Sequence, residues 1–345
     1  MDFISALQWS NWKQLNDQGK QFIFNQITMY FISPLAKVSD VHLANFEILG
    51  IKCRTFSLKI DGEPFVLVPG NSEAVLGWDT DFKGIRTSDV MAETPNPKLA
   101  PLETAEYDFT DYQEAVDYLN RFTTPLRKAE IPPMLVQTSA IPVGANYKGT
   151  LNLITGEFSG DNDFYQRYKV QIQKRLFPEL TPAAALTWNS PKELFQEAGY
   201  YLRLLPNEEQ YLLYQLQETT YHQIVKALHN YNYDLLTEDQ WEFACGGGTR
   251  QLFRWHPDLL FAKNANLADF KQANMFGLYF DTSKSRFELT NSPDCLKLTD
   301  YQKAHFVIVD RLPLATYYRN EEWLETDKVL EPQKYTYRKA ILIEA

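Results

Sequence analysis

The sequence predicts an α+β fold with little regular secondary structure and a helical element at its N-terminus. Apolar residues recur at roughly helical spacing through the first 32 positions, up to Ser33-Pro34, which predicts that element. Two apolar segments flank Asp61-Gly62, a pair typical of β-hairpin turns. Long stretches without periodicity, such as residues 79–105, argue against a tidy layered sheet.

Composition limits the class of protein and of partner. The chain has 345 residues, 44% of them hydrophobic and 14% aromatic, which is enough for one large domain or two. The net charge of −10 argues against nucleic acid as a partner, because polyanions are bound by a concentrated basic face. The three cysteines form no C-x-x-C pair, so we expect neither a zinc knuckle nor a disulfide framework.

The N-terminus lacks the basic start and apolar core of a signal peptide, and no run of 18 apolar residues exists. We therefore expect a soluble cytoplasmic protein without a membrane partner. Binding of the N-terminal helix to a membrane surface is the weaker alternative, because its polar face is not notably basic.

The remaining elements are predicted from apolar periodicity and turn residues. We expect extended segments at residues 50–60, 65–68, 131–147, 306–309 and 340–343. We expect helices at residues 111–122, 190–205 and 207–229. Thr110 is the expected N-cap of the first helix, and Ser190-Pro191 begins the second.

Residues 234–248, DLLTEDQWEFACGGG, have the pattern of a short capped helix. Thr237 is placed to be the N-cap, and Gln240 can reach back to complete a capping box. Leu236 and Trp241 have the spacing of a hydrophobic staple.

The end of this helix is also marked. Glu238 puts negative charge at the end favoured by the helix dipole, and the glycines at 246–248 stop the helix, one of them in the left-handed conformation. A phosphate-binding loop is the weaker alternative, because no Lys-Ser or Lys-Thr follows the glycines.

The same stretch resembles the R-L-P-T-E-A-E-W-E-[YF]-A-A-R-G-G pattern of the formylglycine-generating-enzyme family, also called sulfatase-modifying factors. Residues 65–77, 265–270 and 273–281 are similar to further segments of that family, in the same order. The matched scaffold positions include Thr237, Glu238, Trp241, Gly247 and Gly277.

The resemblance implies an irregular fold related to C-type lectins. It divides the chain into an N-terminal helical extension, residues 1–48, and a formylglycine-generating-enzyme-like domain, residues 49–345, with an insertion around residues 79–130.

Departures from the family's pattern imply that its chemistry is absent. The family's calcium-binding segment corresponds to residues 283–289, where Glu288 matches but Lys284 would repel the ion, so the calcium site is expected to be lost. The family's copper-binding cysteine pair has no counterpart, because residues 305–345 contain no cysteine. Formylglycine generation is therefore not expected, and we predict no cofactor.

A histidine-bound iron site is an alternative. His222 and His229 are seven residues apart in a predicted helix and therefore share a face. The remaining histidines are scattered singly, so ordinary surface histidines are the simpler interpretation.

The favoured hypothesis is a non-catalytic binding or interaction protein whose ligand is a small molecule, a glycan or a protein. The resemblance places a ligand groove at Trp255, Asn266, Asn274, Tyr279, Arg311 and Arg319. The simpler interpretation of any one of these residues is that it packs in the core of an irregular fold. The alternative function is an iron-dependent oxidoreductase of the same fold.

Overall fold

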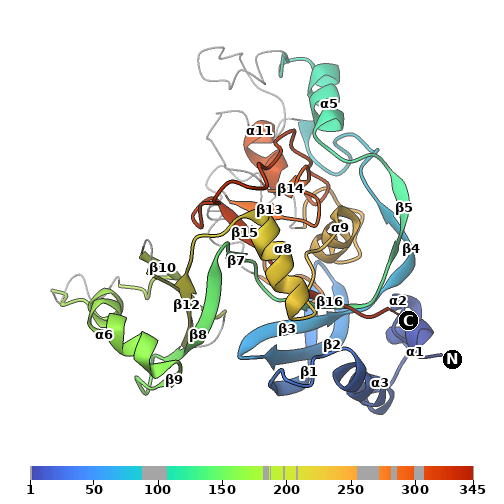
Figure 1. Cartoon of the computed structure of the whole chain (residues 1–345). Coiled ribbons are helices and arrows are strands. Elements are labelled where there is room, and N and C mark those ends of the chain that lie inside the picture. Colours follow the sequence, from blue (N-terminus) through green and yellow to red (C-terminus); the bar gives the residue numbers. More distant parts are fainter. Residues whose placement is uncertain are drawn as a thin grey trace.

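The computed structural model describes residues 2–87, 107–181, 186, 188–196, 199–206, 209–254, 272–280, 286–298 and 307–344 (Figure 1). The helices are α1 (Phe3–Ala6), α2 (Trp9–Trp12), α3 (Asp17–Tyr30), α5 (Tyr112–Arg121), α6 (Asn162–Leu176), α8 (Tyr221–Asn230), α9 (Glu238–Gly246) and α11 (Val307–Arg311). They combine with small, mostly antiparallel sheets, so the predicted α+β class is confirmed.

A five-stranded antiparallel sheet forms the base of the molecule, in the order β1-β2-β3-β6-β16 (Figure 1). Its strands are β1 (Val38–Ile48), β2 (Ile51–Ile60), β3 (Glu63–Val68), β6 (Met134–Gln137) and β16 (Ala340–Leu342). The sheet is covered on both faces. Phe65 and Leu67 pack in the core formed with the N-terminal helices, whereas Val66 and Val68 share a core with Trp241 of α9.

The turn between β2 and β3 was predicted correctly. Asp61 and Gly62 both have positive φ, 51° and 87°, as a two-residue type I′ hairpin turn requires. The turn is local in the sequence, so neighbouring residues alone determine it.

The helix predicted within residues 234–248 is α9. The Thr237 hydroxyl accepts the Gln240 N–H at 3.1 Å, and the Gln240 side chain accepts the Thr237 N–H at 2.9 Å. Gly247 ends the helix at φ 57°. All residues from Gln240 to Gly246 are buried, so α9 lies inside the core rather than on its surface.

A second five-stranded antiparallel sheet, in the order β10-β11-β12-β8-β9, projects to the left in Figure 1 and carries α6 on one face. Its strands are β8 (Ala145–Asn152), β9 (Phe158–Gly160), β10 (Glu193–Gln196), β11 (Tyr200–Leu204) and β12 (Gln210–Leu216).

The helices predicted at residues 190–205 and 207–229 are therefore wrong, apart from α8. In β11 and β12 both faces are buried, because Tyr200 and Tyr211 pack against α6 whereas Tyr201 and Tyr214 pack against the rest of the molecule. A strand buried on both faces shows no alternation, so its apolar run cannot be distinguished from a helix by periodicity.

Smaller sheets complete the fold. One has the order β14-β13-β15-β7, and the other pairs β4 with β5. Their strands are β4 (Asn71–Leu76), β5 (Arg127–Ile131), β7 (Ile141–Pro142), β13 (Phe287–Leu289), β14 (Leu296–Lys297) and β15 (Tyr335–Tyr337).

Three further local predictions are corrected. The expected strand at residues 306–309 lies largely in helix α11. The N-cap of α5 is Asp111, whose carboxylate accepts two backbone N–H groups, rather than Thr110. Residues 38–48, assigned to the helical extension, form β1 and pair with β2. The division into domains is not otherwise tested and stays a prediction.

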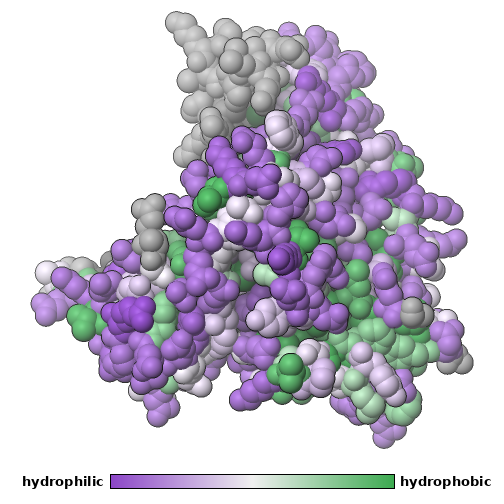
Figure 2. Space-filling model, viewed as in Figure 1, coloured by the Kyte–Doolittle hydropathy of each residue, from purple (hydrophilic) through white to green (hydrophobic). Residues whose placement is uncertain are grey.

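Most of the face shown in Figure 2 is hydrophilic, with a hydrophobic area at the lower right, near the N-terminal helices. On α3, Phe22, Met29 and Tyr30 are exposed. Within the described residues, none of the helices combines the length and the apolar character that crossing a membrane requires.

Substitution Thr237→Ala should remove the N-cap of α9 and lower the free energy of unfolding by about 1 kcal/mol. Thr237→Ser keeps the hydroxyl and is the matched control, which should stay close to the parent protein. Urea denaturation followed by circular dichroism measures both, and equal stabilities for the alanine and serine variants would contradict the capping role.

Candidate functional site

The second sheet has one face that changes character along its length. Leu212 and Tyr214 of β12 lie on the face opposite α6 and pack against Phe287 of β13 and Leu228 of α8. Gln210 precedes them by two residues and lies on the same face, because side chains in a strand alternate. At Gln210 the face no longer packs against the rest of the molecule, and its side chains are polar.

Cross-strand pairing places further polar residues on this part of the face. Asn152 pairs with Gln210, and Thr150 pairs with Leu212 and with Ser159 of β9. Cross-strand partners point to the same face of a sheet. Strand pairing therefore places hydroxyl and amide groups from three strands on one surface.

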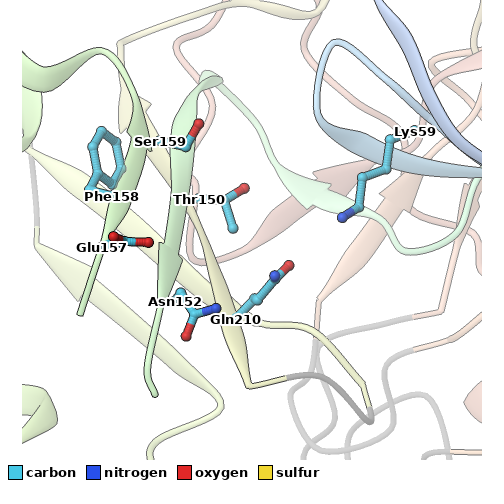
Figure 3. A pocket seen from close by; sticks show the side chains of 7 residues that line it. All are labelled: Lys59, Thr150, Asn152, Glu157, Phe158, Ser159 and Gln210. Atoms are coloured by element: carbon cyan, nitrogen blue, oxygen red, sulfur yellow. The ribbon is translucent and has the colours of Figure 1, made fainter. Parts of the chain in front are cut away.

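This polar surface is the floor of a cleft of about 530 Å³ (Figure 3). The lining residues are Lys59, Thr150, Asn152, Glu157, Phe158, Ser159 and Gln210. Figure 3 shows the Lys59 side chain extending from β2 toward the floor, so the first five-stranded sheet contributes Lys59 to the lining opposite the second sheet. The volume lies within the range of roughly 300–1,000 Å³ that small-molecule sites occupy.

Tyr147 links the floor of the cleft to the β2–β3 hairpin. Its hydroxyl lies 2.7 Å from the Thr150 hydroxyl. Its ring packs against the turn, since a Cβ atom added to Gly62 would lie 2.5 Å from the Tyr147 hydroxyl oxygen. Burial raises the pKa of Tyr147 above its ordinary value, so the phenol, already neutral at physiological pH, stays protonated in its hydrogen bond with Thr150.

The β8–β9 turn forms one end of the cleft. Asn152 Oδ1 accepts the N–H groups of Ile154 and Thr155 at 2.8 and 3.1 Å, which fixes the turn. Glu157 follows and is exposed. The Phe158 ring points away from the cleft (Figure 3) and stacks on Tyr165 of α6 at 4.3 Å.

Two polar groups of the lining have unused hydrogen-bonding capacity. Gln210 Oε1 is enclosed and accepts no hydrogen bond from the described residues, so it is an unsatisfied acceptor. The Lys59 ammonium pairs with Asp40 at 2.9 Å, and the Asp40 side chain is 60% exposed. A lysine has three N–H donors, so one ion pair leaves it able to bind a second acceptor.

A second constellation, around α9, is structural. Glu242 is fully buried and accepts hydrogen bonds from Lys297 and Thr124, each at 2.9 Å, and from Arg127 at 2.9 Å. Lys297 Nζ also donates to Glu238 at 2.8 Å and to the Tyr318 carbonyl at 3.1 Å.

All three N–H donors of Lys297 are therefore used, and the groups are enclosed. Burial opposes the charge on Lys297, but Glu242 and Glu238 outweigh it and raise the pKa of the ammonium. This network holds α9 to β5 and β14.

The residues predicted to line a ligand groove do not meet in the cleft. Asn274 is buried, and its amide N–H₂ donates to the carbonyls of Ala244 and Cys245 while its oxygen accepts two backbone N–H groups. It therefore fixes the end of α9. The Tyr279 N–H donates to the Thr138 carbonyl at 2.7 Å.

The two arginines of that set are also separate from the cleft lining. Arg311 ends α11, and Arg319 is 52% exposed and 4.0 Å from Glu238. Trp255 and Asn266 lie outside the described residues. Gly277 was predicted as a scaffold position, and a Cβ added there would meet the ring of Phe46.

The histidine pair is not assembled into a metal centre. His222 and His229 are both exposed, and each lies near a separate carboxylate, Asp327 at 3.9 Å and Asp234 at 2.9 Å. Within the described residues, no three histidine, cysteine or acidic side chains are grouped as a metal would require. Glu288, compared above with a calcium ligand, is buried in an ion pair with Arg338 at 2.5 Å.

Comparison with known families identifies one segment of the chain. A family model described as a profilin-like domain of unknown function matches residues 146–215, which span most of the second sheet together with α6. No curated protein matches the chain.

The resemblance to the formylglycine-generating enzymes and sulfatase-modifying factors is therefore wrong. The matching family is a different one, and it matches a different part of the chain from residues 234–248. The expected C-type-lectin-like fold and the interpretation as a degenerate member of that family are withdrawn with it. The cap, staple and glycine stop of α9 are explained by helix formation alone.

Sequence reasoning missed every residue of the cleft. The lining comes from residue 59 and from positions between 150 and 210, which no local pattern connects. The Asn152–Gly156 turn between two strands was the one available signal, because it marks a hairpin within residues predicted to be extended or unassigned.

Substitution Lys297→Met should destabilise the protein by about 3–5 kcal/mol, because it leaves the buried Glu242 carboxylate without its ammonium partner. The double variant Lys297→Met/Glu242→Gln should recover part of that loss. Urea denaturation measures both variants. A loss below about 1 kcal/mol for the single variant would contradict the buried network.

Proposed function

We propose that the protein is a ligand-binding protein that holds a small polar molecule in the cleft between its two five-stranded sheets, without covalent chemistry. The observation that carries the proposal is the change along one sheet face. The face is apolar where it packs, at Leu212 and Tyr214, and polar where it opens, at Gln210 and Asn152.

The chemistry of the lining supports binding rather than catalysis. The lining side chains offer hydroxyls, amides, one ammonium and one carboxylate, and none of them is a histidine or cysteine. The hydroxyl of Thr150 is paired with a neutral phenol rather than with a base. These groups are suited to hydrogen-bond and orient a ligand.

The construction of the cleft supports a defined pocket over an incidental surface hollow. The backbone of its floor is fixed by strand pairing, and the β8–β9 turn is fixed by the Asn152 side chain. Tyr147 holds the hairpin that carries the opposite wall. Groups that are already ordered lose little conformational entropy when a ligand binds.

The lining is almost entirely polar, which sets the expected affinity. Little apolar surface is buried on binding, so the affinity must come from hydrogen bonds and charge. We therefore expect dissociation constants of about 10 μM to 1 mM, which correspond to roughly 4–7 kcal/mol.

The test is a thermal-shift screen with sugars, polyols, amino acids, short peptides and dicarboxylates, followed by calorimetry. A ligand that binds the folded state raises the melting temperature with its concentration. Substitution Ser159→Trp fills the cleft and should abolish the effect. Ser72→Trp, at an exposed position of β4, is the matched control and should leave it unchanged.

A ligand whose affinity is unaffected by Ser159→Trp would show that it binds elsewhere and would contradict the proposal. The absence of a saturable ligand in every class of the screen would contradict it as well.

A further inference from the structure

The cleft carries opposite charges at its two ends. Lys59 lies on the wall formed by β2, and Glu157 lies on the β8–β9 turn at the other side of the floor (Figure 3). At neutral pH a lysine side chain is cationic and a glutamate side chain anionic. Between them lie groups that both donate and accept hydrogen bonds, chiefly Asn152 and Gln210.

We propose that the cleft selects a zwitterion, a molecule such as an amino acid or a short peptide with one free carboxylate and one free ammonium. This inference rests on the proposed binding function. The ligand carboxylate lies toward Lys59 and the ligand ammonium toward Glu157. The amide groups of the floor contact the atoms between the two charges.

The end of the cleft that would bind the ligand carboxylate is available, although Lys59 already has a partner. The Asp40 carboxylate is 60% exposed, and the Lys59 side chain is 20% exposed. An ion pair with so exposed a partner contributes about 0–1 kcal/mol, so it offers little resistance to a second acceptor. The remaining N–H donors of the ammonium can bind a ligand carboxylate while Asp40 stays in place.

The end of the cleft that would bind the ligand ammonium is available because Glu157 is exposed. Its hydrogen-bond partner is the Thr155 hydroxyl at 3.5 Å, which leaves most of its acceptor capacity unused. A carboxylate in this position attracts a ligand ammonium and repels a second ligand carboxylate. The cleft therefore disfavours dicarboxylates and other anions.

A neutral saccharide fits the cleft less well. Saccharide sites commonly supply an aromatic face on which the ring stacks. Phe158 is the aromatic residue of the lining, and its ring stacks on Tyr165 on the other side of the sheet. A neutral ligand would also form no ion pair with Lys59 or Glu157.

Binding of a zwitterion joins two parts of the chain. Lys59 belongs to the five-stranded sheet at the base of the molecule, whereas Glu157 belongs to the segment that matches the profilin-like domain. A ligand that contacts both therefore adds to the contacts already made by Tyr147 at the β2–β3 hairpin.

The experiment compares glycylglycine with three analogues of similar size by calorimetry at low salt. Glycylglycinamide lacks the carboxylate, N-acetylglycylglycine lacks the ammonium, and N-acetylglycylglycinamide lacks both charges. Glycylglycine should bind about threefold to fivefold more tightly than either singly charged analogue and about tenfold more tightly than the neutral one. Glucose is included as the neutral saccharide.

Two charge-removing variants assign the ends. Lys59→Gln should abolish the preference for glycylglycine over glycylglycinamide, and Glu157→Gln should abolish the preference over N-acetylglycylglycine. Lys52→Gln, on the same strand β2, and Glu73→Gln, on β4, are matched controls that should keep both preferences. Thermal unfolding verifies that each variant is folded.

The outcomes separate this inference from the proposed function. Glucose binding in the cleft without any preference for glycylglycine would overturn the zwitterion inference and leave the binding function in place. Equal affinity for the charged and neutral peptides would do the same. Binding of none of these probes, together with a negative screen, would overturn both.

Discussion

The two-residue period of strand β12 is the constraint on which the candidate site depends. Tyr211 and Leu213 point toward α6, so Gln210, Leu212 and Tyr214 must point the other way. Two of these three residues are apolar and pack, and the third is polar and lies in the cleft. The change from apolar to polar side chains within β12 therefore marks where the sheet stops packing against the rest of the molecule.

The rest of the cleft follows from how the two five-stranded sheets meet. The β2–β3 hairpin reaches the second sheet through the contact between Gly62 and Tyr147. The Arg203 guanidinium donates to the Ala140 carbonyl at 2.5 Å, which adds a second attachment on the same face. Because these contacts join partly buried side chains to backbone on the facing segments, the hairpin that carries Lys59 is held opposite the polar floor.

The sequence predicted the elements whose causes are local. The turn at Asp61-Gly62 and the capping box of Thr237 and Gln240 depend on residues within a few positions of one another, and both are present. β11 and β12 were predicted as helix because both of their faces are buried, which removes the alternation that marks a strand. Their partners, α6 and β13, lie far away in the sequence.

The candidate site could not be predicted for the same reason. Lys59 and Gln210 lie in different sheets, and the packing of these sheets, which no short motif encodes, brings them to one cleft. Asn274 illustrates the opposite error, because an asparagine predicted to contact a ligand instead satisfies the backbone at the end of α9. A polar residue in a similar motif is thus explained by the hydrogen bonds that the fold itself requires.

Binding of a zwitterion to the polar face of the second sheet is tested most directly by nuclear magnetic resonance of selectively labelled protein. With ¹⁵N in asparagine and glutamine side chains, and with Gln210→Met to assign one signal, glycylglycine is titrated. Binding at this face should produce saturable shifts of the Asn152 and Gln210 amide signals. Saturable shifts confined to amides outside the cleft, or no shifts at all, would contradict it.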